Sequence, residues 1–251
     1  FLWNKLMLLK KRTGAIFIIL GDHRQCPPIE DGIEVDYFNH PYTKFLTGGH
    51  RIELTTPQRY DIQLWNWLEK YYEDGDEGES IVKKKIELND ILYRKNICYY
   101  NKTRKDLNEI CMGIIKRDKM FVALEYKGEE DIQQTAFIYT GLPLMAHKCN
   151  KDLEIINTEE FWVSEFSSAD ETITMYRDED GEDGDKLTIG FKEFHKNFMV
   201  NYASTTHKSQ GATITRGINI WDWGMLCQDR RIGYTAVSRA KTCDQVWINE
   251  I

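Results

Sequence analysis

A polar cluster follows an apolar, strand-like run in the segment NYASTTHKSQGATI, residues 201–214. Five small, polar or cationic residues stand where the strand pattern gives way to a helix pattern: His207, Lys208, Ser209, Gln210 and Gly211. In α/β proteins, strand ends that lead into helices usually carry ligand-contacting groups, because helix N-termini present free N–H groups there. The alternative is an ordinary capped helix with a solvated first turn.

Two further polar clusters lie beside apolar runs, at residues 22–25 and 234–239. In the second, Thr235, Ser238 and Arg239 are spaced to lie on or near one face of a helix. Arginine suits a phosphate ligand because its planar guanidinium is always charged and donates two hydrogen bonds together. Since the strand-end loops of a parallel sheet open on one edge, all three clusters are expected to converge on one ligand.

The runs around these clusters predict an α/β fold. Residues 2–11 have apolar groups at helical spacing, and the KKRTG that follows predicts a helix stop. AIFIIL, residues 15–20, has the unbroken apolar character of a buried strand in a parallel sheet. Asp61 is a candidate cap for the helix after it, and NICYY, residues 96–100, predicts a second buried strand before a helix over residues 101–116.

The pattern changes after about residue 140. Short β-like runs separated by polar turns predict a small antiparallel β-barrel inserted into the α/β domain. KLTIGFKEF, residues 186–194, is one of these runs. Strand and helix patterns return from about residue 200, with a helix expected from about Lys208.

The composition is that of a folded globular protein, with 251 residues, 41% hydrophobic and 29% charged. The net charge of −7 argues superficially against a nucleic-acid partner. However, the loops EDGDEGE (73–79) and DEDGEDGD (178–185) hold eleven carboxylates, and without them 33 cations face 29 acids. We expect these loops to be solvated turns and the remaining surface to be locally basic.

Six cysteines are scattered without a CxxC pair or zinc spacing, which predicts reduced thiols in an intracellular protein and no metal site. No apolar run is long enough to span a bilayer, so no membrane partner is expected. The chain begins without a signal peptide or an initiator Met, which suggests a piece of a longer protein.

GDHRQCPP, HKSQG and YTAVSRAK, in that order, resemble motifs III, V and VI of superfamily 1 helicases, particularly the branch of RecD-like and Pif-type enzymes. ELTTPQRYD resembles motif IV of that branch, and GLPLMAHKCNKDLEIINTEEFWV resembles the strand pair that opens its small barrel. The sequence departs from the family at Cys26, where Leu is usual, at PQRY in place of FRQ, and at Thr158 in place of Gly.

The resemblance implies a RecA-like parallel-sheet domain with an inserted small antiparallel β-barrel, preceded by the tail of another RecA-like domain. Residues 1–55 would be that tail, 56–140 and 199–251 the second RecA-like domain, and 141–198 the barrel. The sequence has no GxxxxGK[ST] loop and no Asp-Glu pair after an apolar strand, so ATP and Mg²⁺ would be held by a first RecA-like half that is missing here.

The resemblance also implies roles at the nucleotide. Gln25 would sense the γ-phosphate, in a loop that Gly21 and Asp22 hold. Arg59 and Arg239 would act as arginine fingers, stabilising charge that develops on the phosphoryl group. Gln210 and Gly211 would lie near the nucleotide, as would Lys208, which is also suited to DNA.

Thr205, His207 and Ser209 would donate hydrogen bonds to the backbone of single-stranded DNA, which positions the strand without reading its sequence. The implied function is the C-terminal portion of an ATP-dependent DNA helicase that moves 5′ to 3′ as a monomer. RNA is not excluded, nor is a nuclear, cytoplasmic or viral setting. Two alternatives stay open: a nucleic-acid-binding module without ATPase activity, and a protein-interaction domain that uses the acidic loops.

Overall fold

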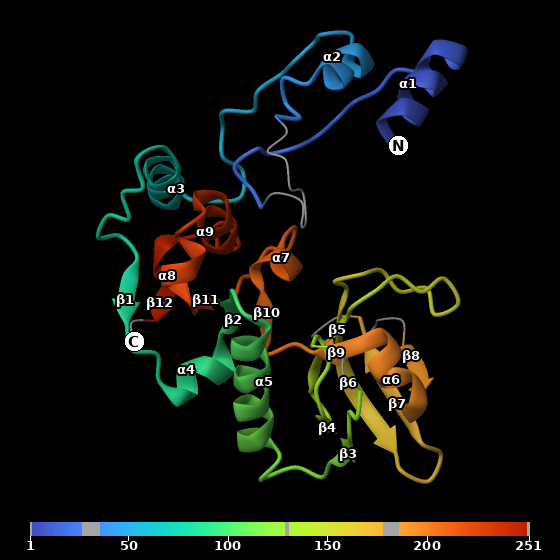
Figure 1. Cartoon of the computed structure of the whole chain (residues 1–251). Coiled ribbons are helices and arrows are strands. Elements are labelled where there is room, and N and C mark those ends of the chain that lie inside the picture. Colours follow the sequence, from blue (N-terminus) through green and yellow to red (C-terminus); the bar gives the residue numbers. More distant parts are fainter. Residues whose placement is uncertain (1, 27–35, 129–130, 178–185, 250–251) are drawn as a thin grey trace.

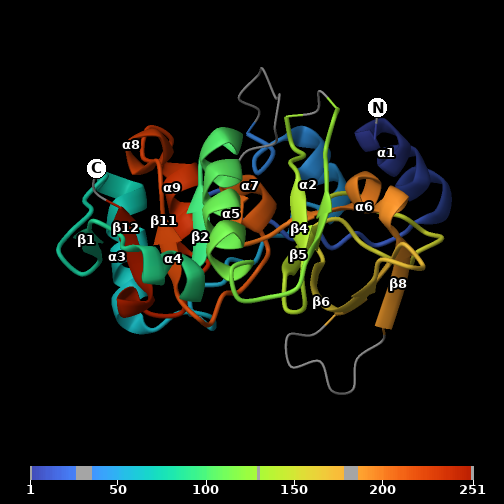
Figure 2. The same ribbon diagram turned by 90° about the horizontal axis from the view of Figure 1, so that it is seen from below.

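The computed structural model of this chain describes residues 2–26, 36–128, 131–177 and 186–249 (Figure 1). It comprises an N-terminal arm, a parallel sheet with helices, and a separate antiparallel sheet. Seen from below, the two sheets lie side by side with helix α5 between them (Figure 2). The predicted α/β class with a separate antiparallel portion is confirmed.

The arm contains two helices, α1 (Leu2–Thr13) and α2 (Pro41–Thr47), and extended segments connect them to the rest of the chain (Figure 1). α1 ends as the sequence predicts. Three cations occupy its last turn, and Gly14 follows with φ +67°, a conformation that glycine adopts without strain.

The apolar segment 15–20 is not the buried strand that the sequence predicts. It is extended but unpaired among the described residues, and Ile16, Ile18 and Leu20 are 91%, 84% and 88% exposed. An apolar run becomes a buried strand only where neighbouring strands satisfy its backbone and cover its side chains. No such neighbours stand beside it in the described part of the chain.

Five parallel strands form the central sheet in the order β1-β12-β11-β2-β10. Their bounds are β1 (Val82–Lys84), β2 (Lys95–Cys98), β10 (Ala203–Thr205), β11 (Ile218–Ile220) and β12 (Val246–Asn249). β2 corresponds to the strand predicted at residues 96–100 but ends at Cys98, so Tyr99 and Tyr100 lie beyond it and are exposed. All four residues of β2 are buried, as expected between two parallel neighbours. Thr205 is paired with Cys98, so β10 and β2 end at the same level.

Helices cover both faces of this sheet. They are α3 (Ile62–Asp74), α4 (Leu88–Tyr93), α5 (Asn101–Ile115), α7 (Thr206–Ser209), α8 (Trp223–Leu226) and α9 (Arg230–Val237), with a short 3₁₀ turn at Cys243–Gln245. α3, α8 and α9 share one apolar cluster with Ile97, whereas α4 and α5 belong to another. Asp61 caps α3 as predicted, because its carboxylate accepts the Leu64 N–H at 2.7 Å.

The second sheet is antiparallel, with strand order β8-β7-β6-β5-β9. Its strands are β5 (Pro143–Ala146), β6 (Glu160–Ser167), β7 (Thr172–Tyr176), β8 (Lys186–Gly190) and β9 (Phe198–Val200). The hydrogen bonds join these strands in a linear order, and α6 (Phe191–Asn197) links the two outer strands. The predicted β-like run 186–194 therefore divides, since its second part forms α6. A separate two-stranded ribbon pairs β3 (Val122–Leu124) with β4 (Ala136–Ile138).

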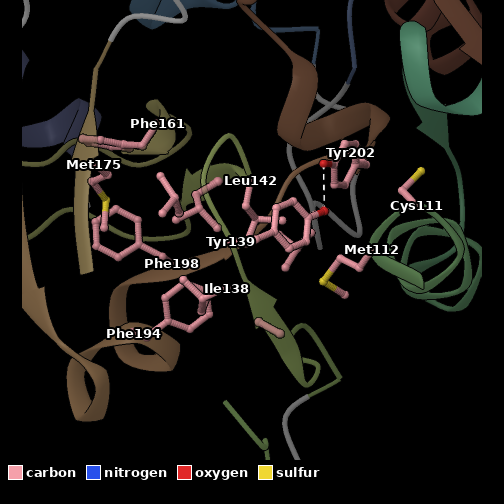
Figure 3. Packing of buried hydrophobic residues seen from close by; sticks show 14 of the residues in the cluster. Cys111, Met112, Ile138, Tyr139, Leu142, Phe161, Met175, Phe194, Phe198 and Tyr202 are labelled. Atoms are coloured by element: carbon pink, nitrogen blue, oxygen red, sulfur yellow. Dashed lines mark hydrogen bonds between the residues drawn. The ribbon is translucent and has the colours of Figure 1, made fainter. Parts of the chain in front are cut away.

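One apolar cluster continues from α5 into the antiparallel sheet (Figure 3). Met112 of α5 and Phe161 of β6 both belong to it, and the buried hydroxyls of Tyr139 and Tyr202 hydrogen-bond to each other at 2.9 Å. The ribbon β3–β4 also packs into this cluster. The predicted domain boundaries, which assign residues 141–198 to the inserted barrel, stay a proposal.

A buried lysine joins the two sheets. Lys95 of β2 is 3% exposed, and its ammonium donates to Asn201 O at 2.9 Å and to Asn201 Oδ1 at 2.6 Å. It also pairs at 3.1 Å with Glu160, the first residue of β6. Because Asn201 lies between β9 and β10, one cation links both sheets and the segment that connects them.

The two acidic loops differ in what is described of them. In the loop 73–79, Glu77 accepts from the indole of Trp223 at 3.0 Å and pairs with Lys83, so this loop is not wholly a solvated turn. The loop 178–185 lies outside the described residues.

All six cysteines are free thiols. Across the described ranges, every helix is too short or too polar to cross a membrane.

Candidate functional site

The loop that follows residues 15–20 is organised by Asp22. One carboxylate oxygen accepts the Arg24 N–H at 3.0 Å and Arg24 Nε at 3.2 Å, and the other accepts Gln25 Nε2 at 3.2 Å. Arg24 also pairs with Glu69 of α3. Both carboxylate oxygens of Asp22 thus accept hydrogen bonds within the loop. Gly21, the residue before Asp22, is exposed.

This loop contacts both of the other predicted clusters. Gln25 Oε1 accepts a hydrogen bond from Gln210 Nε2 at 3.4 Å, and the Cys26 N–H donates to the hydroxyl of Thr235 at 2.8 Å. Gln210 follows the last residue of α7, and Gly211 turns the chain with φ +91°, which favours glycine. Three segments far apart in sequence therefore meet at one place.

Two arginines lie beside this junction at different depths. Arg239 is fully buried, and its guanidinium donates to Thr235 O at 2.9 Å, Ala212 O at 3.2 Å and Ser238 Oγ at 2.7 Å. Burial lowers the pKa of Arg239, and the nearby charge of Arg59 lowers it further. All three acceptors of Arg239 belong to its own segment or to the turn after α7.

Arg59 is half-buried, and no hydrogen bond or ion pair engages its guanidinium from the described residues. Two guanidiniums within electrostatic reach repel each other unless an anion lies between them. The arrangement fits a phosphate group, because Arg59 has its five donors available and Arg239 adds positive charge within electrostatic reach. A magnesium ion fits less well, since no group of three His, Cys, Asp or Glu side chains gathers anywhere in the described ranges.

The residues around α7 point in different directions. Thr205 is the last residue of β10, and both it and His207 are half-buried at the carboxyl end of the sheet. Burial lowers the pKa of His207, partly offset by the charge of Asp229. The helix begins at Thr206, before the predicted start at Lys208, and comprises one turn.

Lys208 and Ser209 do not join the junction through their side chains. The ammonium of Lys208 donates to Asn157 Oδ1 at 3.1 Å and to His147 O at 3.3 Å, so it reaches toward the antiparallel sheet. The hydroxyl of Ser209 is buried and donates to Thr206 O at 2.9 Å, within its own turn. The roles predicted for these two residues stay predictions.

Sequence reasoning missed one residue that shapes this edge of the sheet. Asp222, just after β11, has a backbone φ of +55°, and its carboxylate accepts the N–H groups of Tyr99 and Tyr100 at 3.1 Å each. The only signal in the sequence is an acidic residue directly after an apolar strand, which is a common loop pattern.

Neither the protein-family models nor the curated proteins match this chain. Solved structures do. Pif1 helicase from Bacteroides in complex with ADP-AlF3 and ssDNA matches with a TM-score of 0.62 and 20% identity, over 92% of this chain and 61% of that chain. Pif1 helicase from Candida albicans matches with a TM-score of 0.61 and 17% identity, over 92% of this chain and 63% of that chain.

Bacteroides Pif1 bound to ssDNA matches with a TM-score of 0.57 and 18% identity, over 78% of this chain and 51% of that chain. The chain thus spans between about half and three-fifths of the length of these relatives. The likeness agrees with the order of the sequence motifs and with the α/β architecture. The fold of this chain is therefore similar to that of the Pif1 helicase structures over most of its length.

Proposed function

We propose that this chain is the C-terminal portion of an ATP-dependent DNA helicase. In that enzyme it would respond to the bound nucleotide and bind single-stranded DNA. The observation that carries the proposal is the convergence of three segments. Gln25 meets Gln210, and Cys26 meets Thr235, beside the paired charges of Arg59 and Arg239. A strand-end junction of this kind suits a ligand at the edge of a parallel sheet.

On the nucleotide side, Arg59 and Arg239 are proposed to face the γ-phosphate. Charge that develops on the phosphoryl group during hydrolysis would be stabilised by guanidiniums already held in place. Gln25 belongs to the same junction, so a change at the phosphate would reach Gln210 through one hydrogen bond. Gln210 follows α7 directly, so a movement of Gln210 would be passed through α7 to Thr205 and His207.

On the nucleic-acid side, Thr205 and His207 are proposed to contact the sugar-phosphate backbone of single-stranded DNA. Both are half-buried at the carboxyl end of β10, so their polar atoms are close to the surface on a fixed scaffold. Such contacts are independent of base sequence, as translocation requires. Movement from 5′ to 3′ is the polarity that the resemblance implies.

The exposed apolar residues of the N-terminal arm favour a further RecA-like half in the full-length protein. Ile16, Ile18 and Leu20 on one segment, and Ile52 and Leu54 on the other, are all more than 80% exposed. Apolar side chains left uncovered along two such segments fit strands that pair with a further sheet. We propose that the same half holds ATP and Mg²⁺, because this sequence has no GxxxxGK[ST] loop.

Two substitutions test the strand-binding side. Thr205→Val and His207→Ala are each expected to weaken binding of a 20-nucleotide single-stranded DNA about tenfold, because each removes a polar contact to the backbone. Thr188→Val and His50→Ala, exposed and remote from the junction, serve as matched controls. Fluorescence anisotropy at low salt measures all four. If the Thr205 and His207 variants bind as the controls do, these residues do not contact the strand.

A further inference from the structure

Two adjacent tyrosines are exposed at the carboxyl end of β2. Tyr99 and Tyr100 are 37% and 44% exposed, and their rings meet edge to face with centroids 4.9 Å apart. The other large aromatic residues near this sheet are mostly in its core; Tyr71 and Tyr234, for example, are each 1% exposed. An exposed pair of aromatic rings on a strand-end loop therefore indicates a site at which a ligand covers the rings.

The backbone that carries the two rings is firmly held. Oδ2 of Asp222 accepts the N–H groups of both tyrosines at 3.1 Å, and Oδ1 accepts the hydroxyl of Thr103 at 3.0 Å. Asp222 itself has φ +55°, an uncommon conformation for a residue other than glycine, which persists only where its surroundings fix it. The rings are thus presented on a pre-ordered platform and lose little freedom when a ligand binds.

The platform lies next to the proposed strand-binding residues. Cys98 is paired with Thr205, so Tyr99 and Tyr100 extend from the same edge of the sheet at which α7 begins. Tyr100 also lines an open pocket of about 620 Å³ that extends from Asp222 toward Lys83 and Asn249, on the side of the sheet away from β10. A pocket of this volume is in the range that accepts small planar ligands.

We propose that Tyr99 and Tyr100 form a stacking platform for unpaired bases of the single strand. This inference rests on the proposed function, and it adds a base-contacting site to the backbone contacts of Thr205 and His207. Every base has a flat π-face, so stacking on tyrosine holds a strand without selecting its sequence. The carboxyl end of β2 then holds the bases while the carboxyl end of β10 holds the phosphates.

The test compares two oligomers that have the same phosphates, a 20-nucleotide oligothymidine and an abasic strand of equal length. Tyr100→Ala and Tyr99→Ala are each expected to weaken oligothymidine binding about tenfold. Tyr100→Phe retains the ring and should bind as the unsubstituted chain does. Tyr93→Ala, which removes a 76% exposed tyrosine at the end of α4, is the matched control.

Two further readouts distinguish stacking from phosphate contact. The alanine variants should leave the dependence of log K on log salt concentration unchanged, since no phosphate contact is lost. They should also leave abasic binding unchanged. Equal binding of oligothymidine by Tyr100→Ala, Tyr99→Ala and Tyr93→Ala would overturn the platform while the backbone contacts stand. Equal losses on both oligomers would assign the tyrosines to the backbone instead, and no binding by the unsubstituted chain would contradict the proposed function itself.

Discussion

The backbone N–H of Cys26 donates a 2.8 Å hydrogen bond to the side-chain hydroxyl of Thr235, which lies 209 residues further along the chain. That hydroxyl also donates to Arg231 O at 2.7 Å, and Thr235 is fully buried in α9. The loop organised by Asp22 is therefore attached directly to the helix that precedes Arg239. This attachment, with the contact between Gln25 and Gln210, places the three polar clusters at one junction.

Replacing Thr235 with valine should loosen this attachment. The shape of the side chain is kept, but the Cys26 N–H loses its acceptor, which costs about 1–2 kcal/mol in the free energy of unfolding. Amide exchange at Cys26 should accelerate while exchange in β2 does not. Thr188→Val removes only an exposed hydroxyl contact with Thr174 on the neighbouring strand, so this control should change stability by less than about 0.5 kcal/mol. Unchanged exchange at Cys26 would mean that the loop is held elsewhere.

The Lys95–Glu160 pair should contribute to the docking of the two sheets. Glu160→Gln removes the charge that balances a fully buried ammonium, and we expect it to lower the free energy of unfolding by about 2 kcal/mol. Glu165→Gln alters an exposed carboxylate on the same strand and should have little effect. Urea denaturation measures both. Equal stability of the two variants would show that the ion pair adds nothing to the fold.

Two half-buried histidines should make stability depend on pH. Burial lowers the pKa of His195 and of His207 below the ordinary value of 6.5, partly offset by the Leu124 carbonyl and by Asp229 respectively. Because the unfolded chain then binds more protons, the free energy of unfolding should be highest above pH 6.5. It should fall as the pH drops from 6.5 toward the folded-state pKa values.

Urea denaturation between pH 5 and 8 measures this slope. Substituting both histidines by glutamine should make the slope shallower over that interval. A slope identical to that of the unsubstituted chain would show that these two groups do not titrate differently in the folded and unfolded states.

Arg59 and Arg239 should respond differently to substitution. Arg239→Ala removes a fully buried side chain with three hydrogen bonds and should lower the free energy of unfolding by about 3 kcal/mol. Arg59→Ala should leave stability within about 0.5 kcal/mol. However, it should abolish the rise in Tm that tripolyphosphate produces in the unsubstituted chain, since bound anion stabilises the folded state.

Differential scanning fluorimetry with and without tripolyphosphate makes this comparison, and Arg12→Ala on α1 is the control for general loss of charge. A rise in Tm that persists in Arg59→Ala would remove Arg59 from the anion site. In a separate phosphate-release assay the unsubstituted chain should release no phosphate from ATP, because its sequence has no GxxxxGK[ST] loop to hold the β-phosphate.

Much of the fold could be read from local patterns. The capping carboxylate of Asp61 and the end of α1 depend on neighbouring residues, and the structure confirms both. The buried strand predicted at 96–100 is confirmed only as far as Cys98, because Tyr99 and Tyr100 lie beyond it and are exposed. The order of the motifs along the chain also indicates the α/β architecture. These features are fixed by short-range backbone chemistry and by hydrophobic periodicity, which a sequence displays directly.

Other features depend on partners that a sequence does not display. The segment 15–20 has the composition of a buried strand, but strands need neighbours, and the described residues give it none. Lys208 donates to Asn157, and the hydroxyl of Ser209 donates to Thr206 O within its own turn. Both contacts depend on tertiary packing, which local spacing does not reveal.

A salt titration of oligothymidine binding measures whether this chain binds single-stranded nucleic acid through the phosphates of the strand. We expect measurable binding at low salt and a linear fall of log K with log salt concentration, with a slope of about −0.7 for each phosphate contacted. A chain that binds no oligothymidine at low salt, or binds it with an affinity that salt does not change, would contradict it.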